Sequence, residues 1–158
     1  MEGMEINGLP LHPLVVHAIV VLLPLATLGT IVIAVHPTWR RPYGPLVVAA
    51  ALVATVLCPV ATSSGEELEK RVGDPGQHAA LGDTLVWFAL ALLVTSAALV
   101  WLERRHQRTD QVRRPAFLSV VAVVAVVVAL ASAVQVYRVG DSGARAAWGD
   151  AATSSSGD

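Results

Sequence analysis

Four long apolar runs, separated by short polar connections, limit most strongly what this chain can fold into. They cover approximately residues 14–35, 43–61, 79–102 and 115–137. Each run is long enough to cross a bilayer as a helix, which takes roughly 20 apolar residues. Hydrophobic residues make up 54% of the 158-residue chain and charged residues only 15%, whereas soluble domains carry about 25% charged residues. We therefore predict an all-α integral membrane four-helix bundle over residues 1–143, followed by a flexible polar tail over residues 144–158.

Charge, cysteine content and motifs exclude several functions. The formal net charge is −1, so we expect no nucleic-acid partner. The single cysteine, Cys58, lies in an apolar run and cannot form a disulfide framework or a cysteine metal cluster. The sequence contains no serine–histidine–acid arrangement, phosphate-binding glycine loop or zinc-protease motif. We expect that the chain is not an enzyme on its own.

The basic residues are distributed unequally between the two sides of the predicted bundle. The connections after the second run and the segment after the fourth contain four Lys or Arg residues. The connections after the first and third runs contain seven: Arg40, Arg41, Arg104, Arg105, Arg108, Arg113 and Arg114. Because basic loops stay in the cytoplasm, this excess predicts that both termini lie outside.

Three histidines fall on the predicted outer side, at or near the starts of the first and third runs. They are His12, His17 and His78. An ionisable residue in a membrane helix is costly and usually has a function or a partner. His12 and His17 are five residues apart, so they point about 140° apart on a regular helix and are unsuited to sharing one metal ion. The deeper His17, together with His78 from another helix, is the better predicted pair.

These histidines predict two kinds of site. Neutral imidazoles can bind a haem iron from both faces, so a haem b with His17 and His78 as axial ligands and Arg138 near a propionate is one prediction. A metal ion bound by His12, His17 and His78 is the alternative. The histidines could also be structural, with His12 and His78 hydrated at the interface and His17 hydrogen-bonded to a neighbouring helix.

Several of these segments together resemble a known family of bacterial membrane proteins, called domain of unknown function 2231. The resemblance rests on the opening motif at residues 11–17, Gly65-Glu66, His78 with Gly82, and residues 136–140. It covers about residues 8–143. It implies a four-helix membrane domain, a bacterial cytoplasmic membrane location and a redox setting, without a defined activity.

Three functions stay open at this level. The first is a redox-associated haem-binding subunit that works with other membrane or electron-transfer proteins. The second is a non-catalytic membrane assembly module in which the histidines serve structure. The third is a small transporter or metal-handling protein, which would have to form oligomers because four short spans leave little room for a transport pathway in one monomer.

Overall fold

The computed structural model describes residues 5–6, 9–72, 76–108 and 115–154. Four long helices dominate it: α1 (Leu11–Val35), α2 (Arg40–Val72), α3 (Gln77–Gln107) and α4 (Ala116–Ser154). A short 3-10 helix, η1 (Pro37–Trp39), joins α1 to α2. Two antiparallel two-residue strands, β1 (Glu5–Ile6) and β2 (Leu9–Pro10), precede α1.

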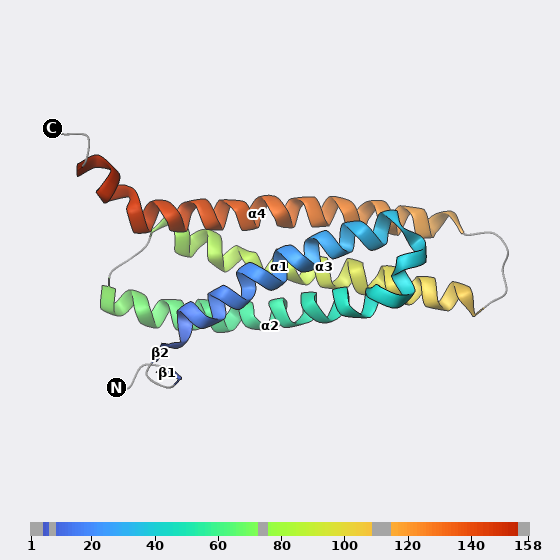
Figure 1. The fold of residues 1–158 in the computed structure, drawn as a ribbon, viewed down its shortest axis with the longest axis horizontal. Coiled ribbons are helices and arrows are strands. Elements are labelled where there is room, and N and C mark those ends of the chain that lie inside the picture. The colour runs from blue at the N-terminus through green and yellow to red at the C-terminus, as the bar shows by residue number, and fades with distance from the viewer. Residues whose placement is uncertain (1–4, 7–8, 73–75, 109–114, 155–158) are drawn as a thin grey trace.

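The helices run up and down, with α1 packed against α2, α2 against α3, α3 against α4 and α4 against α1 (Figure 1). The starts of α1 and α3 therefore lie at the same end of the bundle as the ends of α2 and α4. We call this the histidine end, and we call the opposite end the arginine end. Each of the four helices has a stretch long and apolar enough to cross a membrane. The predicted all-α four-helix membrane bundle is confirmed.

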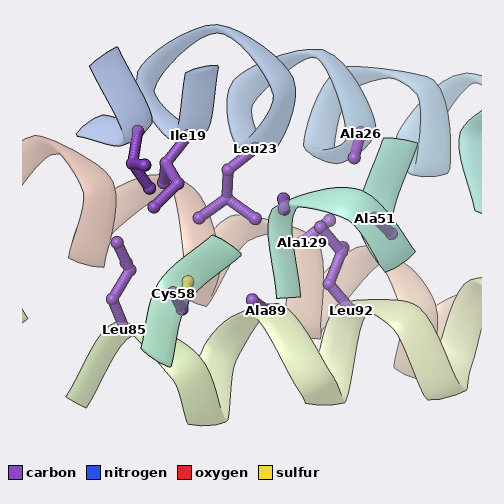
Figure 2. Packing of buried hydrophobic residues seen from close by; sticks show 11 residues of the cluster. Ile19, Leu23, Ala26, Ala51, Cys58, Leu85, Ala89, Leu92 and Ala129 are labelled. Carbon is purple, nitrogen blue, oxygen red and sulfur yellow. The ribbon is translucent and has the colours of Figure 1, made fainter. Parts of the chain in front are cut away.

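Small side chains bring the helices close together. Ala51 and Ala54 of α2, Ala89 of α3, and Ala125 and Ala129 of α4 are fully buried in the described structure. The larger buried residues Leu23 and Leu92 pack in one cluster with Ala51, Ala89 and Ala129 (Figure 2). Lipid tails are as apolar as leucine, so close van der Waals packing over small residues must hold membrane helices together.

The outer faces carry large apolar side chains instead. Val120, Val123, Val127 and Val134 of α4 are each about 60% exposed. In water such a face would aggregate, whereas in a bilayer it contacts acyl chains. In the described part of the bundle, every buried side-chain nitrogen and oxygen has a hydrogen-bond partner. For example, the side-chain amide of Gln135 donates to the Leu81 carbonyl and to the Thr84 hydroxyl.

Two helices extend beyond their predicted spans at the histidine end. α2 continues from the predicted end at residue 61 to Val72, and α4 continues from residue 137 to Ser154. Residues 144–154, predicted as part of a flexible tail, are thus helical, and residues 155–158 lie outside the described structure. In α4 an Arg145–Asp141 ion pair one turn apart supports this extension. Hydropathy marks the depth of the bilayer, but a helix can continue into water on local interactions alone.

Candidate functional site

His12, in the first turn of α1, is anchored to α2. Its Nδ1 lies 3.0 Å from the Ala61 carbonyl oxygen and 3.2 Å from the Ser64 hydroxyl. A carbonyl oxygen only accepts hydrogen bonds, so Nδ1 carries the proton and donates it. The Ser64 hydroxyl donates to the same Ala61 carbonyl at 3.1 Å, which leaves its oxygen free to accept from Nδ1. In the neutral ring the lone pair is therefore on Nε2.

His78, in the first turn of α3, repeats this arrangement against α4. Its Nδ1 lies 3.1 Å from the Val139 carbonyl oxygen and 3.2 Å from the Ser142 hydroxyl. Ser142 in turn donates to the Val139 carbonyl at 2.9 Å. Both histidines thus have the same tautomer and the same anchor, a backbone carbonyl with a serine hydroxyl three residues later.

A glycine lies under each imidazole ring. A Cβ atom added at Gly65 would lie 3.0 Å from Cε1 of His12, and one added at Gly143 would lie 2.9 Å from Cε1 of His78. Any larger residue at either position would push the ring away from its carbonyl and serine partners. Each half of the bundle therefore carries a serine–glycine pair that seats one histidine.

The equivalence extends along the whole length of the helices. The buried residues of α1 after His12 include Ile19, Leu23, Ala26 and Thr30. In α3, the buried residues Leu85, Ala89, Leu92 and Ser96 lie at the same intervals after His78. The same holds for α2 and α4. In α2, the buried residues before Ser64 include Val47, Ala51 and Ala54, and in α4 the buried residues Ala125, Ala129 and Ser132 lie at the same intervals before Ser142. The hairpin α1–α2 is thus a structural repeat of the hairpin α3–α4.

His12 and His78 line one cavity at the histidine end, between α1, α2 and α3. Its volume is about 280 Å³, close to the lower limit of about 300 Å³ for typical ligand pockets. Apolar side chains such as Val16, Ile19 and Leu85 form most of the wall. Val20, also on the wall, is 58% exposed on the outer face of α1. The cavity therefore lies next to the lipid-facing surface.

The charged residues among the described lining residues of this cavity are all carboxylates. Glu66 and Glu69 of α2 and Asp83 of α3 line it, and no Lys or Arg is among its described lining residues. With low-dielectric walls around it, this charge attracts cations and repels anions.

Two of the predicted site residues lie elsewhere. His17 is exposed on α1, does not line the cavity, and its Nδ1 donates to the Pro13 carbonyl at 2.6 Å. Arg138 is exposed on α4 and also lies off the cavity wall. His12, rather than the deeper His17, thus shares a cavity with His78. His17 was predicted because it lies further inside the first span. Which ring faces a neighbouring helix depends instead on the rotation of the helix about its axis.

The residues present do not fit the predicted haem. The proposed axial pair, His17 and His78, does not share a cavity. A haem propionate placed here would meet Glu66, Glu69 and Asp83, and Arg138 is not on the wall to neutralise it. An anionic cofactor would therefore be repelled, whereas a cation would be attracted.

The arginine end contains a buried ion pair that sequence reasoning missed. A guanidinium nitrogen of Arg40 lies 2.8 Å from Glu103 Oε2, and both residues are at most 4% exposed. Arg40 also donates to the carbonyls of Ile33 and Ala34 in the last turn of α1. In the sequence, Arg40 counts only as one of the basic residues that predict the orientation of the protein in the membrane. Its position directly after a span, opposite an acidic residue at the end of another span, was the available signal.

The serines that anchor the histidines were also missed. Ser64 resembles a helix-end residue in the sequence, and Ser142 lies in what looks like a loop, Gly140-Asp141-Ser142-Gly143. One signal in the sequence could have found them. A Ser-Gly pair follows the second span and another follows the fourth, and a histidine lies at the start of the first span and of the third.

The fold and the histidine end define a small polytopic membrane protein built from two equivalent hairpins. Residues 8–156 match the family described as "Predicted membrane protein (DUF2231)", so the chain belongs to that family. The resemblance seen in the sequence is thereby confirmed. No curated protein and no solved structure matches the chain.

Proposed function

We propose that this protein binds a divalent transition-metal ion at its histidine end, as a metal-handling membrane protein. The observation that carries the proposal is the matched anchoring of His12 and His78, which line the same acidic cavity. Histidines that bind metals almost always donate their other ring N–H to a carbonyl or carboxylate, which fixes the tautomer and the ring orientation. Both rings already make this bond.

The available donors suit such an ion. Nε2 of neither ring has a hydrogen-bond partner within the described ranges of the chain. Imidazole nitrogen suits zinc, copper, iron and nickel, and carboxylate oxygen can complete the coordination. Among the described residues no three His, Cys, Asp or Glu side chains form a ready-made cluster. The two imidazoles are therefore the fixed ligands in this proposal, with water or a rotated carboxylate from the cavity wall completing the shell.

The test is a titration of detergent-purified protein with Zn²⁺ by calorimetry and with Co²⁺ by visible absorption. We expect one site per chain, and His12→Ala and His78→Ala should each weaken binding more than tenfold, as expected for the loss of a ligand. His17→Ala is the matched control, because this exposed ring lies off the cavity and should leave the affinity unchanged. Absence of binding, or an equal effect of all three variants, would overturn the proposal.

The same samples separate the remaining functions. A Soret band after haem addition that depends on His17 and His78 would restore the haem-binding subunit. A colourless protein that binds no ion but co-purifies with another membrane protein would favour an assembly module. We further propose that the histidine end faces outward in a bacterial cytoplasmic membrane, which would expose the site to ions outside the cell.

A further inference from the structure

Three arginines at the arginine end line a hollow that the proposed metal site does not involve. Arg41, at the start of α2, and Arg104 and Arg108, at the end of α3, form it together with Gln107. Its volume is about 420 Å³. A neighbouring hollow shares Arg104 and Arg108 and adds Trp101 and Arg105. None of the described lining residues of either hollow is acidic.

Among the described residues, these guanidinium groups have no acidic partner. In the part of the chain that the structure describes, Arg41, Arg104 and Arg108 form no ion pair. The closest acidic residue along α3, Glu103, is already bound to Arg40 and also accepts from the Gln107 amide. Three like charges around one hollow repel one another, so an anion bound between them would relieve that repulsion.

The hollow lies at the level of the lipid headgroups. Trp101, Trp39 and Tyr43 are all about half exposed at this end of the bundle, as expected for the aromatic belt at a membrane interface. The Arg105 guanidinium lies 5.3 Å from the centre of a Trp101 ring. Below this level the lipid-facing surface is apolar, so a ligand with acyl chains has a surface on which to lay them.

We propose that this hollow binds the phosphate of an anionic phospholipid. Guanidinium groups hold phosphate through paired N–H donors with a geometry that an ammonium group does not match. Basic pockets between membrane helices are typical sites for acidic headgroups. A lipid is favoured over free phosphate because the neighbouring hollow, which shares Arg104 and Arg108, is also lined by the half-exposed Trp101. This site is independent of the proposed metal site.

The experiment counts lipids bound to the intact, detergent-solubilised protein by native mass spectrometry. Phosphatidylglycerol, phosphatidylcholine and inorganic phosphate are added in separate titrations. We expect phosphatidylglycerol to bind at least about tenfold more tightly than phosphatidylcholine. Its affinity should fall as the salt concentration is raised. Inorganic phosphate should bind far more weakly than the lipid. Equal binding of the two lipids would overturn the proposal, and phosphate binding as tight as the lipid would overturn the choice of a lipid.

A matched pair of triple variants separates this site from general attraction. Arg41→Gln/Arg104→Gln/Arg108→Gln removes three charges from the hollow and should reduce phosphatidylglycerol affinity about tenfold or more. Lys70→Gln/Arg138→Gln/Arg145→Gln removes three charges from exposed positions at the histidine end and should leave the affinity unchanged. All six side chains are exposed, so both proteins should fold, which circular dichroism checks. An equal loss in both variants, or no loss in the first, would refute the site.

Discussion

His12 and His78 occupy equivalent positions in two repeated hairpins and line the same cavity. Each ring is fixed through Nδ1 by a carbonyl and a serine hydroxyl on the partner helix of its own hairpin. Such a pair leaves two Nε2 atoms with defined tautomers at one end of a membrane bundle. Substitutions of the serines and glycines that hold the two rings test these anchors.

The serine anchors should tune metal affinity without being ligands. Ser64→Ala and Ser142→Ala each remove one partner of a histidine N–H, and we expect Zn²⁺ affinity to fall about 10- to 100-fold in both. Calorimetry on the purified variants measures this. Ser63→Ala is the control, because Ser63 is exposed and bonds only to backbone carbonyls of its own helix. Comparable losses at Ser63 and Ser64 would contradict the assigned anchors.

The two seating glycines should be sensitive to a single methyl group. In Gly65→Ala and Gly143→Ala the new Cβ would press on the ring and disturb its two hydrogen bonds. We expect roughly tenfold weaker Zn²⁺ binding with little loss of helicity, since alanine favours a helix over glycine by up to about 1 kcal/mol. In Gly140→Ala the Cβ meets open space, so metal binding should not change. A tight Zn²⁺ site in Gly143→Ala would argue that His78 is not held as described.

The Arg40–Glu103 pair should contribute more to stability than any other charge in the described structure. Arg40→Ala removes the cationic partner of a buried carboxylate and the donor to two α1 carbonyls, and we expect it to cost about 3–5 kcal/mol of unfolding free energy. Arg41→Ala, an exposed neighbour, should cost less than about 0.5 kcal/mol. Chemical denaturation in detergent compares the two variants.

The double variant Arg40→Met/Glu103→Leu should recover most of that loss. An apolar pair of similar volume avoids the desolvation of two buried charges. The repeat supports this expectation, because the α4 position equivalent to Arg40 is the buried Leu118. A double variant as unstable as Arg40→Ala would show that the ion pair itself, rather than the filled volume, is required.

Membrane orientation can be tested with single cysteines. Cys58 is buried, so a Cys58→Ala background allows Gln77→Cys to report the histidine end and Thr38→Cys the arginine end, both at exposed positions. The excess of arginines at the arginine end predicts that end to be cytoplasmic. A membrane-impermeant maleimide applied to intact cells should label the cysteine at position 77 and spare that at position 38. The reverse pattern would invert the proposed orientation.

The membrane-spanning parts of the helices were predictable from the sequence, but their extensions beyond the membrane were not. Hydropathy located all four spans, because a membrane core tolerates only long apolar helices. It placed the end of α2 at about residue 61, although the helix continues through Ser64 to Val72. That extra length matters for the site, because the serine and glycine that seat His12 lie on it.

By itself, the sequence determined that this protein is a four-helix membrane bundle with three of its five histidines at one end and seven of its eleven Lys and Arg residues at the other. Composition indicates that the solvent around the helices is a bilayer. The lengths of the apolar runs give the number of spans and the depth of each residue in the membrane, and all of this can be read along a single chain. Only the tertiary structure decided that His12 rather than His17 lines a cavity with His78, and that Arg40 forms an ion pair with Glu103. Those choices depend on the rotation of each helix about its axis and on which carbonyls of a neighbouring helix come within hydrogen-bonding distance. They are settled only when the small residues of all four helices pack together.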